Sequence, residues 1–205
     1  IIFFILALAI NFLIVYLFRS YTIISNLIII SSLFLIISSL FDLVKSFKKT
    51  KIDLARITSH LSFGFLVLFI GLNHNFSTEK DFNLKVGEKI NFDNYEIKFK
   101  RLNLKNFDNY KAVIGDIEIK NTKLGEINTL NPEIRIYDNP RTLTYEAAIK
   151  TNLIKDYYLT MSNIDRSEFY NIKFQKKPMM IWIWISVFML SLGGFLRVFK
   201  NANNN

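Results

Sequence analysis

The chain has 205 residues, 51% of them hydrophobic, and a formal net charge of +9. This apolar share and the positive mean hydropathy of +0.23 argue against an ordinary soluble domain and indicate a membrane protein. The absence of cysteine excludes disulfides, a thiolate nucleophile and thiolate metal sites. Residues 73–177 hold 18 Lys or Arg and 15 Asp or Glu, so basic residues are not concentrated as a nucleic-acid partner would require.

Four apolar runs follow the chain from its first residue. A membrane-spanning helix needs roughly 20 largely apolar residues to cross ~30 Å of hydrocarbon. The runs that reach or approach this length are 1–18, 21–41, 54–72 and 178–196. Because the sequence opens at Ile1 inside a hydrophobic run, without the basic segment and cleavage site of a signal peptide, we expect it to be part of a longer polypeptide.

Basic residues set the expected orientation of these runs. Lysines gather in the loop at 45–56, and Arg197 and Lys200 follow the last run, so both segments are predicted to face the cytoplasm. Arg19 and Ser20 then form a tight external turn. The predicted organisation is three transmembrane helices in 1–72, a periplasmic β-rich domain in 73–177, and a final transmembrane helix with a short cytoplasmic tail in 178–205.

The segment 73–177 carries strand patterns. Apolar residues alternate with polar ones at Tyr95/Ile97/Phe99, Ile117/Ile119, Ile134/Ile136 and Tyr170/Ile172/Phe174. The pairs Asp93-Asn94 and Asn121-Thr122 are turn formers, which favours antiparallel hairpins, and a short helix is predicted at 145–149. The expected fold class is therefore a membrane α-helical protein of about four transmembrane helices with an inserted extracytoplasmic antiparallel β domain.

Signatures of a complete active site are missing from the sequence. It contains no phosphate-binding glycine loop, no histidine pair at zinc spacing and no nucleophile elbow. With two histidines in all, the fragment alone is not expected to be catalytic.

His60 is the leading candidate for a functional residue. It lies one helical turn after Arg56, about 6 Å into the third apolar run. An ionisable side chain in hydrocarbon is costly unless it has a partner, so it marks a functional position by default. A neutral imidazole is also a good iron ligand.

Three roles for His60 stay open from the residues alone. Its helical face continues with Gly64, Val67 and Gly71, which leave space beside the imidazole for a flat macrocycle or for another helix. In the second case the chain is a membrane-anchored scaffold or binding module without a cofactor. A third possibility is a transporter fragment in which His60 relays protons.

The other polar and aromatic positions are less specific. His74, Trp182 and Trp184 are expected at the external membrane interface, where amphipathic rings settle. In the β-rich segment, Arg135 and Tyr137 should share one strand face, with Arg141 and Glu146 following. That group is either a surface for a protein or a haem propionate, or a solvated ion-pair face.

A collinear series of segments resembles the C-terminal region of the cytochrome c maturation haem lyases of the CcmF/NrfE family. The matching segments are Ser59-His60-Leu61, 75–81, 85–88, Pro132-Glu133-Ile134-Arg135-Ile136-Tyr137, 144–149, Asp156-Tyr157-Tyr158, 177–184 and Leu192-Gly193-Gly194. The resemblance covers about residues 55–199.

This resemblance implies a function and a cofactor. His60 matches the family histidine that is an axial ligand of a b-type haem among the membrane helices, with Gly64 leaving room for the macrocycle. The whole subunit is then expected to attach haem covalently to apocytochrome c, with a haem chaperone, the apocytochrome and other maturation subunits as partners. The implied location is the bacterial inner membrane.

Overall fold

The structure is a computed structural model that describes residues 1–18, 22–47, 53–163 and 167–202. It divides into a helical unit, formed by Ile1–Ser77, Leu153–Lys155 and Pro178–Asn205, and a β unit, formed by Thr78–Asn152 and Asp156–Lys177. The predicted external turn at Arg19 and Ser20, and residues 48–52 of the predicted basic loop, lie outside the described residues.

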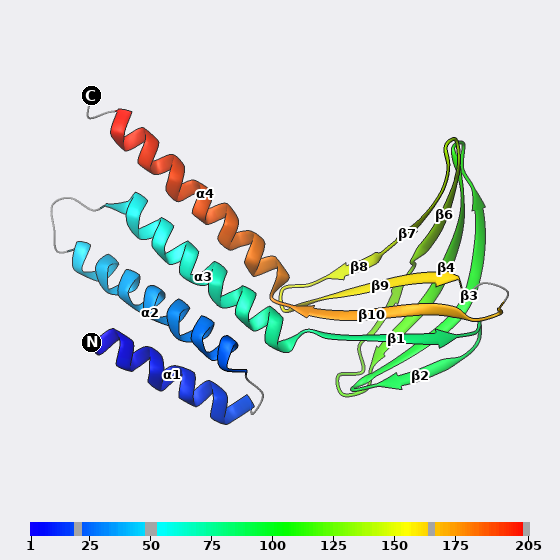
Figure 1. The fold of residues 1–205 in the computed structure, drawn as a ribbon, viewed down its shortest axis with the longest axis horizontal. Coiled ribbons are helices and arrows are strands. Elements are labelled where there is room, and N and C mark those ends of the chain that lie inside the picture. Colours follow the sequence, from blue (N-terminus) through cyan, green and yellow to red (C-terminus); the bar gives the residue numbers. More distant parts are fainter. Residues whose placement is uncertain (19–21, 48–52, 164–166, 203–205) are drawn as a thin grey trace. The chain divides into compact units, whose positions relative to one another are not determined.

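The helical unit contains four apolar helices that lie side by side in chain order, each antiparallel to the next (Figure 1). They are α1 (Ile2–Phe18), α2 (Ile23–Ser46), α3 (Leu54–Phe76) and α4 (Met180–Ala202). In the described part of the chain, α2, α3 and the segment Met180–Phe199 of α4 are long and apolar enough to cross a membrane. Helix α1 is equally apolar but shorter, at 17 residues.

Small polar residues form the buried face of α2. Ser25, Ser32, Ser39 and Ser46 recur every seven residues and are all buried. Ser32 Oγ donates to the Ile29 carbonyl at 2.8 Å and Ser46 Oγ to the Asp42 carbonyl at 2.7 Å, both within α2, whereas Ser25 Oγ donates to α3. Small side chains let helix backbones approach closely, which is the usual means of packing helices in lipid.

Helix α3 continues beyond the apolar run to Phe76, although the β-rich segment was predicted to begin at residue 73. Its polar last turn is held by neighbours. Asn73 Nδ2 donates to the Pro178 carbonyl at 2.5 Å, and Ser25 Oγ donates to Asn75 Oδ1 at 2.5 Å. These hydrogen bonds to other parts of the helical unit stabilise the helix through residues 73–76. From the sequence alone, these polar residues indicate only the membrane interface.

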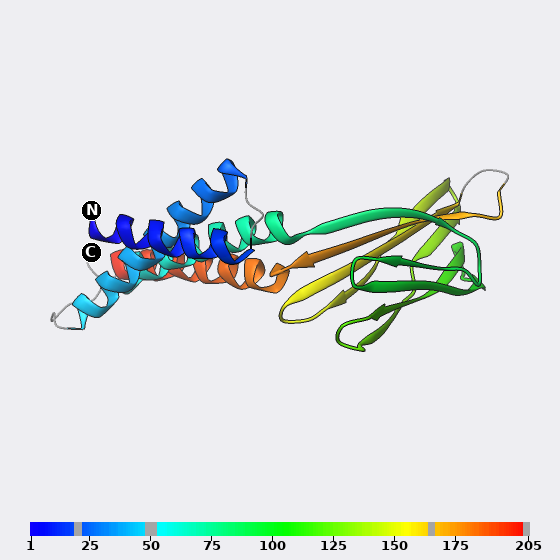
Figure 2. The ribbon, with the colours of Figure 1, turned by 90° about the horizontal axis from the view of Figure 1, so that it is seen from below.

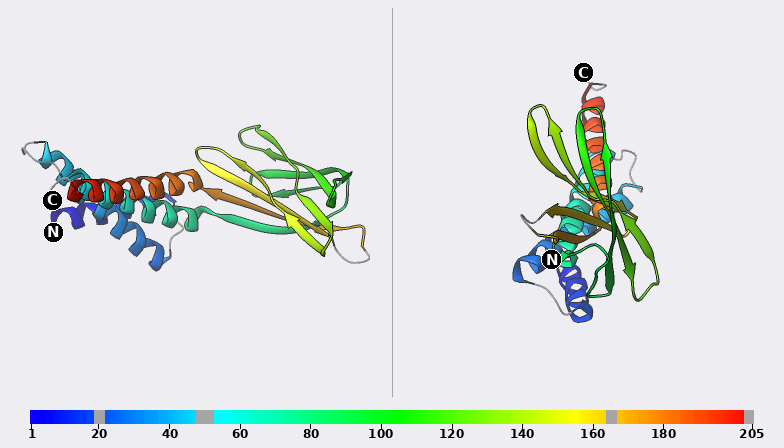
Figure 3. Two further views of the ribbon diagram at one scale, coloured as in Figure 1. Left: turned by 90° about the horizontal axis from the view of Figure 1, so that it is seen from above. Right: turned by 90° about the vertical axis from the view of Figure 1, so that its right-hand side faces the viewer.

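The β unit contains two antiparallel sheets. The four-stranded sheet has the order β1-β10-β9-β8, and the larger sheet has the order β2-β3-β4-β6-β7 with β5 also paired to β4. The strands are β1 (Thr78–Leu84), β2 (Lys89–Phe92), β3 (Tyr95–Asn106), β4 (Tyr110–Asn121), β5 (Ile127–Leu130), β6 (Glu133–Asp138), β7 (Arg141–Glu146), β8 (Ala148–Thr151), β9 (Lys155–Asn163) and β10 (Tyr170–Pro178). Both sheets can be followed in Figures 2 and 3.

The hydrophobic core of the β unit draws side chains from both sheets. Phe99 and Ile117 of the larger sheet and Leu159, Ile172 and Phe174 of the smaller one are fully buried in one cluster. The predicted alternating residues thus belong to β3, β4, β6 and β10. The fold class predicted from the sequence, membrane helices with an inserted antiparallel β domain, is confirmed.

The structure has a turn at the predicted position Asp93-Asn94 but no helix at 145–149. Asp93 adopts a left-handed conformation at φ 50° in the turn between β2 and β3, a backbone region that Asp tolerates. The helix predicted at 145–149 is wrong, because β7 and β8 occupy these residues. Tyr145 pairs with Ile134, and Ile149 pairs with Tyr158. Pairing with neighbouring strands outweighs the favourable helix propensity of the Glu-Ala-Ala triplet, because propensity contributes only a few tenths of a kcal/mol per residue.

Candidate functional site

Three glycines and one serine mark the close packing of α3 against its two neighbours. A Cβ on Gly64 would lie 2.8 Å from Ile36 Cγ1, and a Cβ on Gly71 would lie 2.9 Å from Ile28 Cγ2, so α2 covers this side of α3. On the other side, a Cβ on Gly193 of α4 would lie 2.9 Å from the backbone nitrogen of Ser59. Helix α3 is therefore enclosed on two opposite sides.

His60 lies on a face of α3 that neither neighbour covers. The face follows the helical repeat through Arg56, His60, Phe63, Ile70 and His74, and all five side chains are exposed. Among the described residues, none forms a hydrogen bond or ion pair with the His60 imidazole. The ring nitrogens are therefore open to a ligand, as a metal-binding imidazole requires.

Gly64 does not leave room for a macrocycle beside His60 in this structure. Ile36 of α2 fills the space next to it, and the Ser32 carbonyl lies 3.5 Å from the position of an added Cβ. Close packing on α2 is what the helix-packing alternative predicts for Gly64, and a role for Gly64 beside a macrocycle stays a prediction. His60 itself is exposed on the adjacent face of α3.

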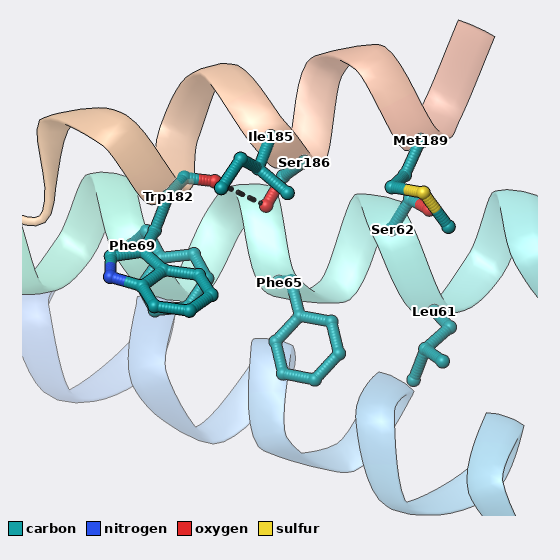
Figure 4. A pocket seen from close by; sticks show the side chains of 8 residues that line it. All are labelled: Leu61, Ser62, Phe65, Phe69, Trp182, Ile185, Ser186 and Met189. Atoms are coloured by element: carbon teal, nitrogen blue, oxygen red, sulfur yellow. Dashed lines mark hydrogen bonds between the residues drawn. The ribbon is translucent and has the colours of Figure 1, made fainter. Parts of the chain in front are cut away.

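An apolar cavity beside α3 lies on a different face from His60. It measures about 320 Å³ and is lined by Leu61, Ser62, Phe65, Phe69, Trp182, Ile185, Ser186 and Met189 (Figure 4). Phe69 packs on Trp182 at 5.8 Å between ring centroids, and Ser186 Oγ donates to the Trp182 carbonyl at 2.7 Å. The lining is almost wholly apolar and does not include His60, so this cavity lies apart from the imidazole.

A second, polar cavity of about 270 Å³ lies at the N-terminal end of α3, lined by Asp53, Ala55, Arg56, Ser59 and Arg197. Arg56 Nη2 lies 3.4 Å from Asp42 Oδ2, and Arg197 Nη1 lies 3.6 Å from Asp53 Oδ2. The sequence pattern did not predict this cluster. The sequence does place one arginine at the start of the third apolar run and another at the end of the fourth, and this placement was the signal that could have predicted it.

Both predicted interface aromatics of α4 lie at its first turns. Trp182 also forms a tertiary hydrogen bond, in which its Nε1 donates to the Leu153 carbonyl at 2.8 Å. Met179 N donates to the neighbouring Ile154 carbonyl at 2.9 Å, which fixes residues 153–155 within the helical unit. Trp184 is 67% exposed and has the free outer ring expected of an interfacial residue.

Three of the four residues predicted as a possible binding surface of the β unit lie on one face of the sheet. Arg135 Nε donates to Glu133 Oε2 at 2.7 Å, and its guanidinium lies 5.0 Å from the centre of the Tyr110 ring. Tyr137 packs on the same ring at 5.2 Å, so Arg135 and Tyr137 share one face as predicted. The Glu133 hydrogen bond holds the pKa of Arg135 above its usual value.

Strand register separates the remaining two residues. Glu146 stands opposite Glu133 and therefore belongs to the Arg135 face, where Thr144 Oγ1 donates to its carboxylate at 3.0 Å. Arg141 stands opposite Asp138 at the end of the hairpin and, by strand alternation, points to the other face. The structure thus brings together Arg135, Tyr137 and Glu146 but not Arg141.

The possible iron ligands of the chain are few. Among the residues that the structure describes, no group of three or more His, Asp or Glu could hold a metal ion. His60 and His74 share a face of α3, but their separation of 14 residues corresponds to about 21 Å along a helix. They cannot ligate one iron together. The two imidazoles are therefore separate positions on α3.

Comparison with known proteins identifies the family. Residues 75–178 match the family described as CcmF C-terminal beta-sandwich, which is 104 of the 205 residues. The chain belongs to the CcmF family. The resemblance seen in the sequence is thereby confirmed, and the two-sheet β unit is the region that carries the match.

Relatives of this CcmF-family chain are longer than the chain itself. It is 32% identical over 141 residues to the cytochrome c-type biogenesis protein CcmF of Haemophilus influenzae, covering 69% of the chain and 22% of that protein. The Escherichia coli CcmF is 26% identical over 144 residues, covering 70% of the chain and 22% of that protein. The chain therefore spans about a fifth of the length of these curated relatives.

A solved structure extends the likeness to the helices. The chain matches the cytochrome c heme lyase CcmF with a TM-score of 0.72 and 18% identity, over 94% of this chain and 33% of that one. At this identity the match shows the fold. The helical unit and the β unit are both included, since neither alone reaches the covered share.

Proposed function

We propose that the chain is part of the haem lyase subunit that attaches haem covalently to apocytochrome c, with His60 as one axial ligand of a b-type haem in the membrane. Membership of the CcmF family supports the assignment to cytochrome c maturation. The curated relatives are named for cytochrome c-type biogenesis, and the solved relative is named a heme lyase.

The open imidazole of His60 carries the haem part of the proposal. It lies on a membrane helix, is exposed, and has no described polar partner, so haem iron would meet no competing bond at the ring nitrogens. A bound b-type haem would supply one-electron transfer. Helix α3 would hold the imidazole in place, because α2 and α4 fix its two other sides. The second axial ligand would come from residues beyond this chain.

The distribution of charge supports the proposed orientation. Lys45 ends α2, Arg56 begins α3 and Arg197 lies near the end of α4, so all three gather at one end of the antiparallel helices (Figure 1). Basic residues beside membrane spans mark the cytoplasmic side. We place the helices in the bacterial inner membrane, with the segment predicted as 73–177 in the periplasm.

The face of the β unit around Arg135 is the proposed docking surface for the haem chaperone or the apocytochrome. Phe107 stacks on Tyr110 at 4.5 Å, and Tyr110 in turn contacts Tyr137 and Arg135. Aromatic residues and arginine are enriched at protein interfaces because they offer large contact areas at a low cost in conformational entropy. The larger assembly would supply the other maturation subunits as neighbours.

A matched pair of histidine variants tests the haem ligand. Membranes containing the chain in its native assembly should show a reduced-minus-oxidised b-type spectrum. His60→Ala should abolish or strongly weaken it, whereas His74→Ala, on the same face of α3, should leave it intact. A spectrum unchanged by His60→Ala would reject the ligand assignment, and a wild type without any such spectrum would favour the scaffold or transporter alternative.

A further inference from the structure

The polar cavity at the start of α3 is the strongest unassigned feature of the helical unit. It is lined by two arginines from different helices, Arg56 of α3 and Arg197 of α4, together with Ser59 and Asp53. Arg56 lines this cavity and also lies on the exposed face of α3 that carries His60. Arg56 therefore lies both in the cavity lining and about one helical turn from His60.

Neither arginine is fully engaged by its aspartate. The distances of 3.4 Å from Arg56 to Asp42 and 3.6 Å from Arg197 to Asp53 exceed the 2.7–2.9 Å of a well-formed charge-assisted hydrogen bond. Their side chains are also 52% and 57% exposed. Each guanidinium has five N–H donors in a planar fork that matches a carboxylate, so most donors remain available to a ligand.

We infer that Arg56 and Arg197 form the subsite for the propionate carboxylates of the haem that His60 ligates. The inference rests on the proposed function. A haem has an apolar macrocycle and one anionic edge, and in a bilayer the anionic edge must reach a polar region. Arg56 is one turn from His60, about 6 Å along the helix, toward the nearer end of α3. The two arginines are cations that line a cavity at this end.

The two cations should also set the redox behaviour of the haem. Ferric haem carries one more positive charge than ferrous haem, so a nearby guanidinium favours the reduced form. Replacing an arginine by neutral glutamine should stabilise the oxidised form and lower the midpoint potential. Replacement by lysine keeps the charge and should preserve most of the potential while losing the bidentate geometry.

A redox titration of membranes containing the chain in its native assembly tests this inference. In Arg56→Gln and Arg197→Gln we expect the ratio of reduced to oxidised haem at a fixed ambient potential to fall about tenfold, which is about 59 mV for one electron. Arg56→Lys should stay close to the wild type. Asp42→Asn is the matched control, because it removes the same ion pair as Arg56→Gln while leaving the cation in place, and it should not lower the potential.

The outcomes distinguish the propionate subsite from the assignment of His60 as a haem ligand. If His60→Ala removes the spectrum but both arginine variants keep the wild-type potential and haem content, the propionate subsite is overturned and the ligand assignment stands. If Asp42→Asn lowers the potential as much as Arg56→Gln, the effect belongs to helix packing and the subsite is again overturned.

Lipid is the other possible source of an anionic group in this cavity. If the arginine variants lose co-purifying phospholipid without any change in potential, the cavity takes a lipid phosphate and the inference fails. If one glutamine variant does not accumulate in the membrane, the other still provides the comparison with Asp42→Asn. A wild-type potential in that remaining glutamine variant would overturn the subsite.

Discussion

The helical unit buries more small polar residues, and exposes more large apolar ones, than the β unit does. In α2, Ser25 and Ser32 are each 1% exposed, while Phe188 on α4 is 64% exposed. In the β unit, Ile97 and Phe99 are fully buried and the charged residues of the strands are mostly exposed. The inversion shows that each unit is arranged for its own solvent, lipid for the helices and water for the β sandwich.

The inversion has an energetic origin. Removing an apolar side chain from water stabilises a fold by about 25 cal/mol per Å² of buried surface, and this favours the core of the β unit. Between helices in lipid that driving force is absent, so association depends on close packing of small residues and on hydrogen bonds. The same substitution should therefore have different consequences in the two units, and the following variants test this.

Truncating a core aromatic in the β unit should have the largest effect. Phe99 is fully buried and contacts Tyr170 edge-on at 5.7 Å, so Phe99→Ala should destabilise the β unit by about 3–5 kcal/mol. Phe188→Ala on the exposed face of α4 should change stability by less than about 0.5 kcal/mol in detergent micelles. Thermal unfolding followed by circular dichroism measures both. Equal losses would contradict the inversion.

Adding a methyl group between α3 and α4 should have an intermediate effect. Gly193→Ala places a Cβ against the backbone of Ser59, which cannot move without separating the helices, and should cost about 1–3 kcal/mol. Gly194→Ala has no atom within 4 Å of its new Cβ and should be neutral or slightly stabilising. Protease resistance of the helical unit in micelles distinguishes the pair. A harmless Gly193→Ala would show that close packing does not hold α4.

The smallest expected effect concerns one carboxyl of the β unit. Asp156 is buried, its Oδ1 has no hydrogen-bond partner among the described residues, and burial raises its pKa above the ordinary 3.8. The folded state therefore binds the proton more tightly than the unfolded state. Stability should be highest below pH 3.8 for this group and should fall as the pH rises through the folded pKa.

Asp156→Asn should remove this contribution to the pH dependence. Each unit of pKa difference corresponds to about 1.4 kcal/mol, so the effect is measurable as a change in the slope of unfolding free energy against pH. Glu168, exposed and paired with Lys85, offers the contrast, because its pKa is lowered and its contribution is lost as the pH falls. A slope unchanged by Asp156→Asn would show that the carboxyl is solvated when the protein is folded.

Patterns of hydrophobicity predicted much of the fold, for physical reasons. Apolar runs of span length predicted the helices, because length and composition suffice in lipid. Alternation predicted β3, β4, β6 and β10, because one face of each strand is buried. The helix at 145–149 failed because local propensity is weaker than pairing with β6 and β9.

The site was only partly predictable for the same reasons. His60 stands out because an ionisable residue in a span is rare, but the role of Gly64 depends on which neighbour packs against it, and sequence alone could not choose. The arginine subsite joins residues 56 and 197, which only the packing of α3 on α4 brings together. The seven-residue repeat of serines in α2 was visible in the sequence and would have predicted its buried face.

Chemical rescue of His60 tests the central claim most directly. His60→Gly removes the side chain while leaving space beside α3, and the low-spin b-type spectrum of membranes containing the chain in its native assembly should be lost. Adding free imidazole should restore it, because an exogenous ligand can then occupy the vacated axial position. A low-spin spectrum that survives the substitution, or retained haem that imidazole fails to return to the low-spin form, would contradict ligation by His60.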